Sequence, residues 1–410
     1  MEKVDGTPLG DIWYSMTPKE QHGIMKQIVE WEARLMSLEF PAFGSLYYHN
    51  DLQSEKRFPL PDERDAAFCI GPIAHYSWWH GHRRALDLDR GPWLSSVDIF
   101  RAVGERELAW TKHYAKPRQP YERLYRGMYH FRNLAPDDHL KNLCDYLSMV
   151  PYLGFKAGTA LHRPVLRHPD FQPNNILVSE KKEILGFIDW QHSTILPLGL
   201  AAWIPKHFQN YGDPESDNLR EPRLALPSNY DSLSHTEQAF AREIVRKRVV
   251  HFLYAAFTKR MNEEHYDAIF DNPTILRQRL FKGAGTPWEG DSVTLRAEMI
   301  RIIQNWTQFS ADSGVNGSGA CSTPPVEYSE KVVQDTLALD MRQKEADTAM
   351  EQMQEALGVD AMRWVPNDEY DAAVAWAWEM KAQMLKAAVT PSEAAAVKDH
   401  FPFDDFDENA

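Results

Sequence analysis

Cysteine is scarce in this chain, which has only three cysteines among 410 residues. Cys69, Cys144 and Cys321 lie far apart in the sequence, and none belongs to a Cys-x-x-Cys pair. Neither a disulfide framework nor a cysteine zinc site is therefore indicated. A reducing, intracellular compartment is the simplest interpretation of this cysteine usage.

Long apolar runs are also missing. A membrane-spanning helix needs roughly 20 mostly apolar residues, and no stretch of the sequence approaches that length. The chain does not open with a charged segment followed by an apolar one, as a secretory leader would. We therefore expect no membrane span.

Positive charge is in the minority, with 45 Lys and Arg against 59 Asp and Glu and a net charge of -14. Such a chain is a poor general binder of nucleic-acid backbones or anionic membranes, although one local site can still hold an anionic ligand. Arg83, Arg84 and Arg90 lie near tryptophans, as in proteins that stack nucleic-acid bases. In so acidic a chain they are better explained as partners of carboxylates or of one anionic substrate, and we expect no nucleic-acid partner.

Helical patterns dominate the sequence. Residues 17–20 (Thr-Pro-Lys-Glu) form a Thr-x-x-Glu capping box with proline at the first helical position, and Ile24, Ile28, Trp31 and Leu35 follow at helical spacing. We expect further helices over about 96–113, 137–150, 234–261, 291–308, 326–357 and 369–388. The sequence therefore predicts a mainly helical α+β fold.

Composition also suggests how the chain is organised. Residues 41–94 are rich in Gly, Pro, Tyr and Trp, have little periodicity, and are interpreted as a long, partly ordered insertion. Residues 311–325 are rich in Ser and Gly and are typical of a linker. We therefore expect one lobe over 1–310 and a helical C-terminal extension over 326–410. Its Trp and Met residues at 361–385 would pack against the lobe, and its acidic tail would be solvated.

Histidines in the insertion offer one alternative site. His75, His80 and His82 could be metal ligands, but no fourth ligand accompanies them at helical or hairpin spacing. A surface aromatic loop explains them better.

The chemically informative segment is 168–190. Residues 168–175 read His-Pro-Asp-Phe-Gln-Pro-Asn-Asn, and two β-rich runs, 176–178 and 184–188, then flank a polar turn. This pattern predicts a hairpin, in which the start of the first strand lies beside the end of the second. The hairpin brings Asn175 close to Asp189, while Asp170 lies on the loop leading in. One amide and two carboxylates then converge, and such hard oxygen ligands suit Mg²⁺ that carries substrate phosphates.

A simpler interpretation must be weighed, because Asn and Asp are common turn residues at strand ends. The number of positions in pattern and the hairpin spacing favour the site. His-x-Asp-x-x-x-x-Asn followed by a hairpin and Asp resembles the catalytic loop and metal loop of protein-kinase-like phosphotransferases. The Ile188-Asp189-Trp190 form resembles the aminoglycoside phosphotransferase and choline kinase branch. Residues 161–205 resemble the fungal "altered inheritance of mitochondria" subgroup, as do Gly71-Pro72, Trp78-Trp79, residues 90–93 and the helix that contains 105–107.

The resemblance covers residues 1 to about 310 and implies a role for each matching position. Asp170 would be the catalytic base, Asn175 and Asp189 the Mg²⁺ ligands, and His168 the residue that supports the loop. The backbone of the hinge strand at Glu2, Lys3 and Val4 would bind the adenine of ATP. Pro169 departs from the related kinases, which commonly have Gly or Arg there, and so affects the expected pose of Asp170.

The resemblance implies a protein-kinase-like C-lobe with a small catalytic β-hairpin. On this alignment the chain begins at the hinge, and we expect the small N-terminal lobe that clamps ATP to be missing from it. The implied function is ATP- and Mg²⁺-dependent phosphorylation of a hydroxyl group on a small molecule, with little activity expected from this chain alone. The alternative is an inactive kinase-like protein or fragment that acts as an interaction module. We also expect self-association through the hinge surface, and a mitochondrial location if the subgroup holds, otherwise a cytoplasmic one.

Overall fold

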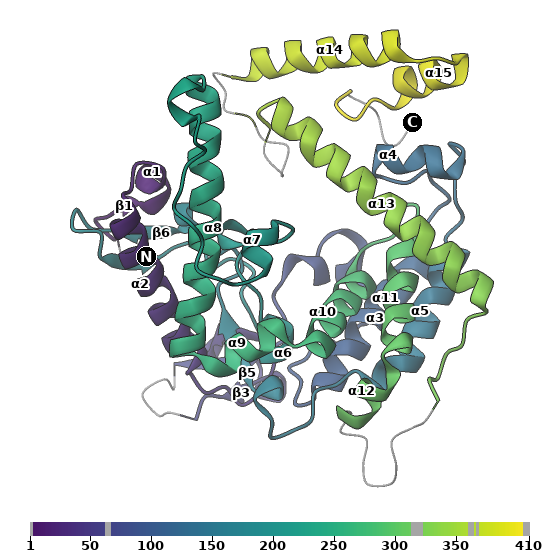
Figure 1. Ribbon diagram of the computed structural model, residues 1–410. Coiled ribbons are helices and arrows are strands. Elements are labelled where there is room, and N and C mark those ends of the chain that lie inside the picture. The colour runs from purple at the N-terminus through teal and green to yellow at the C-terminus, as the bar shows by residue number, and fades with distance from the viewer. Residues whose placement is uncertain (1–2, 62–66, 313–322, 360–364, 366–368, 405–410) are drawn as a thin grey trace. The chain divides into compact units, whose positions relative to one another are not determined.

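The computed structural model describes residues 3–61, 67–312, 323–359, 365 and 369–404 (Figure 1). The chain divides into two compact units. Unit 1 comprises 1–106, 150–281 and 306–322, and unit 2 comprises 107–149, 282–305 and 323–410. This division groups the C-terminal residues with two earlier segments, which the sequence did not indicate.

The described part of the chain is mainly helical, as predicted. Unit 1 contains α1 (Leu9–Trp13), α2 (Pro18–Met36), α6 (Leu198–Ala201), α7 (Pro214–Asp217), α8 (His235–Met261), α9 (Glu263–Phe270) and α12 (Trp306–Asp312). Unit 2 contains α4 (Arg123–Arg126), α5 (Asp137–Met149), α11 (Val293–Gln304), α13 (Glu330–Ala356), α14 (Tyr370–Ala387) and α15 (Pro391–His400). Two further helices, α3 (Ser96–Tyr114) and α10 (Asn272–Gly285), cross the boundary between the units. No helix in these ranges is both long enough and apolar enough to cross a membrane.

The strands of the described residues form three small antiparallel sheets, all in unit 1. The first has the order β1 (Thr7–Pro8), β6 (Ile176–Val178), β7 (Ile184–Phe187). The second has the order β2 (Ser45–Tyr48), β4 (Phe68–Gly71), β3 (Phe58–Pro59), and the third pairs β5 (Pro164–Arg167) with β8 (Thr194–Pro197). The second sheet lies within 41–94, a segment for which the sequence predicted no strands.

The start of α2 confirms the predicted capping box. The Thr17 amide donates to the Glu20 carboxylate at 2.7 Å, and the Glu20 amide donates back to the Thr17 hydroxyl at 3.4 Å. The predicted apolar stripe is partly wrong, because Trp31 is 41% exposed whereas Glu32 is only 3% exposed. Burial of Glu32 is possible because Arg167 pairs with it at 2.9 Å.

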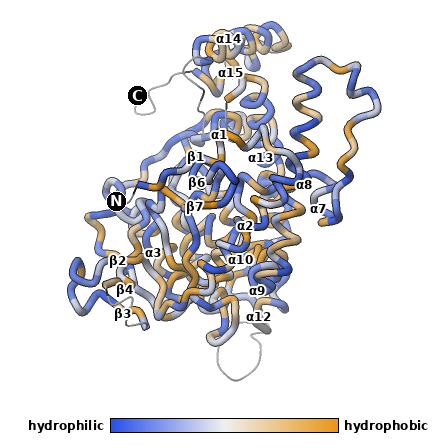
Figure 2. The backbone as a smooth tube through the Cα atoms, turned by 90° about the vertical axis from the view of Figure 1, so that its left-hand side faces the viewer, coloured by the Kyte–Doolittle hydropathy of each residue, from blue (hydrophilic) through white to orange (hydrophobic). Residues whose placement is uncertain are grey.

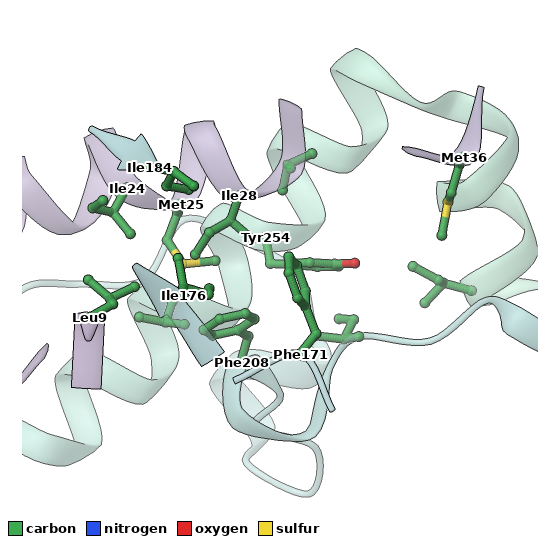
Figure 3. Packing of buried hydrophobic residues seen from close by; sticks show 14 of the residues in the cluster. Leu9, Ile24, Met25, Ile28, Met36, Phe171, Ile176, Ile184, Phe208 and Tyr254 are labelled. Carbon is green, nitrogen blue, oxygen red and sulfur yellow. The ribbon is translucent and has the colours of Figure 1, made fainter. Parts of the chain in front are cut away.

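The core of unit 1 lies where α2 and α8 pack against each other and against the first sheet. Figure 3 shows Ile24, Met25 and Ile28 of α2 directed toward Ile176 and Phe208. In Figure 2 hydrophobic and hydrophilic residues are mixed along the α8 tube, as expected of a helix that buries only part of its surface. The core therefore underlies the hairpin that carries the predicted site.

Two predictions for the C-terminal half need correction. The helix predicted over 291–308 is interrupted at Asn305, between α11 and α12. Trp376 and Trp378 of α14 are 63% and 74% exposed, and the buried residue is Ala377, whose small side chain packs with Leu357 and Phe401. The tryptophans therefore do not pack as expected. Most of the predicted linker, 313–322, and residues 360–364 lie outside the described residues.

Candidate active site

Two paired strands hold the base of the loop that contains the candidate residues. Strand β5 ends at Arg167 and β8 begins at Thr194, and these two residues are paired in the antiparallel register. The 26-residue segment from 168 to 193, which includes the β6–β7 hairpin, therefore begins and ends at one place. A closed base of this kind limits how far the loop can move.

The hairpin has the geometry that the sequence predicted. Ile176 pairs with Phe187 and Leu177 with Gly186. One position further out, the Ile188 amide donates to the Asn175 carbonyl at 3.0 Å. Asn175 and the segment leading into Asp189 are therefore adjacent, although 14 positions separate the two residues in the sequence.

His168 connects the two ends of this arrangement. Its Nδ1 accepts a hydrogen bond from the Asp170 amide at 3.2 Å, and its Nε2 lies 2.8 Å from the Ile188 carbonyl oxygen. Only the neutral ring with hydrogen on Nε2 satisfies both contacts, because the protonated ring could not accept at Nδ1. Burial lowers the pKa of His168, although the Ile188 carbonyl and the charges of Asp170 and Asp189 partly oppose this effect. The neutral form is thus favoured, and both carboxylates lie within electrostatic reach of one ring.

Asp170 is exposed, but one of its oxygens is held firmly. Its Oδ2 accepts from Gln172 Nε2 at 2.5 Å and from Asn175 Nδ2 at 3.1 Å. Asn175 Nδ2 also donates to the Asp170 carbonyl at 2.9 Å. Among the described residues, no hydrogen bond is recorded to Asp170 Oδ1 or to Asn175 Oδ1. One carboxylate oxygen and one amide oxygen are therefore available to a ligand.

Asp189 has an unusual backbone conformation at the end of the hairpin. Its φ is 62°, in the left-handed region that residues other than glycine rarely adopt, and its side chain is exposed. Asp and Asn are the non-glycine residues that tolerate this region best. The following Trp190 lies edge-on to His168, with ring centroids 4.6 Å apart. Strain of this kind, held by the surrounding structure, is often found at functional sites.

A buried ionic network under the loop was not predicted from the sequence. Arg167 Nε and a terminal guanidinium nitrogen each lie 2.9 Å from Glu32 Oε1, and Arg167 also donates to the Ala201 carbonyl at 2.7 Å and to the Tyr254 hydroxyl at 3.1 Å. Tyr254 in turn donates to Glu32. Glu32, Arg167 and Tyr254 are each between 0% and 5% exposed. The network therefore fixes the residue immediately before His168 to α2 and α8.

The predicted adenine-binding segment is only partly described. Met1 and Glu2 lie outside the described residues, and Lys3 and Val4 are not in a strand, contrary to the prediction. Val4 enters a turn instead, because its carbonyl accepts from the Gly6 amide at 3.1 Å. The strand at this end of the chain is β1, where Thr7 pairs with Val178 and Pro8 with Leu177 of β6. Val4 still lies beside the hairpin, since a Cβ added to Gly186 would be 3.8 Å from its Cγ2.

Of the histidines in the insertion, His75 contacts a neighbouring serine and a neighbouring tyrosine. His75 Nδ1 lies 2.9 Å from the Ser77 hydroxyl, and its ring contacts Tyr76 with centroids 4.8 Å apart. Burial lowers the pKa of His75 to about 4. Within the described ranges, no group of three or more His, Cys, Asp or Glu residues is arranged to hold a metal ion. A metal site in which Asn175 is a ligand is not such a group, because asparagine is not among these four residue types.

Comparison with known proteins supports this fold. A family model of the phosphotransferase enzyme family matches residues 1–231, more than half of the chain. The chain belongs to this family, and its kinase-like fold and phosphotransferase class follow from that membership.

Particular relatives are fungal. A subtelomeric hrmA-associated cluster protein of Aspergillus fumigatus is 28% identical over 100% of this chain and 82% of its own length. The altered inheritance of mitochondria protein 9 of Saccharomyces cerevisiae is 23% identical over 87% of this chain and 57% of its own length. The protein of the same name from Lachancea thermotolerans is 24% identical over 86% of this chain and 56% of its own length. No solved structure matches the chain significantly.

Proposed function

We propose that this protein transfers the γ-phosphoryl group of ATP to a hydroxyl group of a small molecule in an Mg²⁺-dependent reaction. The observation that carries the proposal is the arrangement of Asp170, Asn175 and Asp189 around His168. Family membership supports the phosphotransferase class. The use of ATP as donor, the dependence on Mg²⁺ and the small-molecule acceptor are parts of the proposal.

Asp170 is the proposed catalytic base. Its Oδ2 is fixed by Gln172 and Asn175, while its Oδ1 has no recorded partner in the described part of the chain. Oδ1 can therefore accept the proton of a substrate hydroxyl as that hydroxyl attacks phosphorus. The hydrogen bond from the Asp170 amide to His168 fixes the backbone at this position. Orientation of the base is thus set before a substrate arrives.

Asn175 and Asp189 are the proposed Mg²⁺ ligands. Asn175 uses its amide nitrogen toward Asp170 and so directs its oxygen elsewhere, and the Asp189 carboxylate is exposed at the adjacent end of the hairpin. One amide oxygen and one carboxylate fit a hard cation that retains water and phosphate ligands. When bound, Mg²⁺ with ATP would supply the phosphoryl group and neutralise charge on its oxygens. We retain the backbone of residues 2–4 as the proposed adenine contact, because Val4 lies beside the hairpin.

The test is phosphotransfer from Mg·ATP to a library of small hydroxyl compounds, with direct nucleotide binding measured by calorimetry. We expect Asp170→Asn to lower turnover about 10²–10⁴-fold while nucleotide binding persists, because the base acts on the acceptor. Asp189→Ala should remove Mg²⁺-dependent nucleotide binding. Glu180→Gln is the matched control, since it removes an exposed carboxylate from the turn of the same hairpin. Turnover by Asp170→Asn equal to that of the wild type, or Mg²⁺-dependent nucleotide binding by Asp189→Ala equal to that of the wild type, would contradict the proposal.

An interaction module remains the second candidate, and one observation favours it. Leu185, Ile188 and Trp190 are 44%, 42% and 37% exposed at the same hairpin. Apolar side chains in contact with water at one place favour association, including self-association. Sedimentation of the protein over a range of concentrations tests this: a mass that rises with concentration in the wild type and falls after Leu185→Glu would support it.

We also propose a mitochondrial location, because the yeast relatives are named as mitochondrial proteins. Cell fractionation with the tagged protein tests this, and recovery only outside mitochondria would contradict it.

A further inference from the structure

A pocket of about 390 Å³ lies in unit 1 between α1, α2, α8 and the loop before α8. Its lining combines apolar and charged side chains: Tyr14, Met16, Pro18, Gln21, Leu224, Leu226, Ala239, Arg242, Glu243, Val245, Arg246 and Val249. Such a lining suits a molecule with an apolar body and a few polar groups. No sequence pattern indicates this pocket, because its residues come from two distant parts of the chain, 14–21 and 224–249.

Side-chain contacts connect the pocket to the candidate active site. Phe171, next to Asp170, contacts Phe208 with ring centroids 6.3 Å apart, and Phe208 contacts Trp13 at 5.8 Å. The His207 ring lies 5.6 Å from Trp13. Trp13 ends α1, and Tyr14, the next residue, lines the pocket. The pocket and Asp170 are therefore separated by a short set of packed aromatic rings.

The charges that shift the pKa of His207 also indicate that the pocket and Asp170 lie near each other. The pKa of His207 is lowered to about 4, first by burial and then by the positive charges of Arg246 and Lys247. The carboxylates of Glu243 and Asp170 act in the opposite direction. His207 thus lies within electrostatic reach of both Asp170 and the basic residues of α8.

The two arginines of the pocket differ in their partners. Arg246 is held by Glu243, with Nε 2.7 Å from Oε2, and its guanidinium lies over the rings of Trp13 at 5.2 Å and Tyr14 at 4.9 Å. Its charge is therefore matched and its position fixed. Arg242 is exposed and donates to the Tyr230 hydroxyl, and no ion pair with a carboxylate is recorded for it among the described residues. A guanidinium has five N–H donors, so most of those of Arg242 remain for a ligand.

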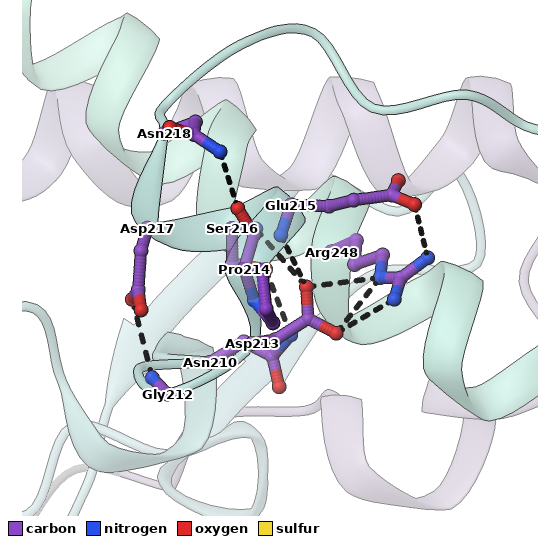
Figure 4. Close-up of polar contacts among 9 residues, drawn as sticks. All are labelled: Asn210, Gly212, Asp213, Pro214, Glu215, Ser216, Asp217, Asn218 and Arg248. Atoms are coloured by element: carbon purple, nitrogen blue, oxygen red, sulfur yellow. Dashed lines mark hydrogen bonds and ion pairs between the residues drawn. The ribbon is translucent and has the colours of Figure 1, made fainter.

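The loop that closes the pocket is anchored to α8. Figure 4 shows Asp213 between the start of α7 and Arg248, with Arg248 donating to Asp213 Oδ2 at 2.7 Å and Oδ1 at 3.1 Å. Asp213 also accepts from the amides of Glu215 and Ser216 at 2.9 and 3.1 Å. This anchor fixes the start of the segment that supplies Leu224 and Leu226.

We infer that this pocket is a binding site for small molecules with an apolar body and a carboxylate or phosphate group. The anionic group binds Arg242, and the apolar body contacts Tyr14, Leu224 and Leu226. Guanidinium pairs with either anion through parallel hydrogen bonds, so both share this recognition. The inference goes beyond the proposed function and does not depend on it, because buried rings separate the pocket from Asp170.

The test measures binding by calorimetry without nucleotide, so that it does not depend on catalysis. The probes are hydroxydecanoate, hydroxydecyl phosphate and the neutral decanediol. We expect both anions to bind at least tenfold more tightly than the diol, and Arg242→Gln to remove most of that difference without weakening the diol. Arg260→Gln is the matched control, because it removes an exposed charge from the far end of the same helix. Circular dichroism would confirm that each variant is folded.

A preference for only one of the two anions identifies which group the pocket takes and supports the inference. Equal binding of anions and diol, equal effects of the two arginine variants, or no binding of any probe would overturn it.

Discussion

Replacing Arg167 with methionine should destabilise unit 1 strongly. Methionine keeps an unbranched stem but removes the charge, so Glu32 at 3% exposure loses its ionic partner and keeps only the Tyr254 hydroxyl. Removing one partner of a buried pair costs about 3–5 kcal/mol, because an uncompensated charge remains in a poorly polarisable environment. The lost hydrogen bond to the Ala201 carbonyl and the contact of Arg167 with the Trp203 ring, at 4.5 Å, act in the same direction. We therefore expect a loss at the upper part of that range.

Two further variants separate the cost of leaving Glu32 buried without a partner from the simple loss of a salt bridge. Arg167→Met combined with Glu32→Gln should be more stable than Arg167→Met alone by about 1–3 kcal/mol, because no charge is then buried without a partner. Lys331→Met removes one member of a pair whose side chains are 84% and 66% exposed. That change should have little effect on stability, because solvent screens exposed helical pairs.

Urea unfolding gives the overall free energy of unfolding, and hydrogen exchange of peptides from α2, α8 and 168–175 gives the local one. Local measurement matters because two compact units need not unfold together. Exchange should become faster in all three peptides of the Arg167→Met variant. A loss no larger than that of Lys331→Met, or a double variant less stable than the single one, would refute the reasoning.

Two further predictions concern burial and backbone geometry. Burial lowers the pKa of His139 to about 4, below its ordinary value of 6.5, so its contribution to stability is present above pH 6.5 and is lost as pH falls toward 4. His139 should therefore make the free energy of unfolding about 2 kcal/mol lower at pH 5 than at pH 7 in urea melts. His139→Gln should remove that part of the difference. An unchanged pH dependence in the variant would contradict this assignment. Gly290 has a φ of 93° and its added Cβ would lie 2.4 Å from the Gln119 carbonyl oxygen, so Gly290→Ala should cost more than about 2 kcal/mol. Gly23→Ala in α2, where nothing lies within 4 Å of an added Cβ, should instead stabilise by about 0.5–1 kcal/mol in urea melts at pH 7. The same sign for both changes would show that the backbone argument is wrong.

Local patterns explain which parts of the fold were predictable. The capping box of α2 and the β6–β7 hairpin depend on residues close in sequence, and both appear as predicted. Strands β1 and β3 have two residues each and include a proline, too short for any alternation to be visible. The pairing of β5 with β8 joins segments separated by the whole site loop, and no local signal specifies it.

The buried network shows a second limit of sequence reasoning. In a helical pattern a glutamate is normally assigned to the solvent face, and the predicted apolar stripe includes Trp31 but not Glu32. The reverse holds because Arg167 and Tyr254, 135 and 222 positions away from Glu32, satisfy its oxygens. Such a partner is visible only after the chain has folded.

The position of this network explains why a strained loop can be held in place. Asp189 has a left-handed φ, and both Asp170 and Asp189 are exposed, so burial of their own side chains does not stabilise either conformation. The hydrogen bonds of His168 tie both ends of the site to one ring, and the residue before it is locked into the core by Arg167. Strain at a functional site persists only where the surrounding structure determines it. Loosening Arg167 should therefore disturb the site as well as the core, although Arg167 is 5% exposed and reaches the site only through the backbone of its neighbour.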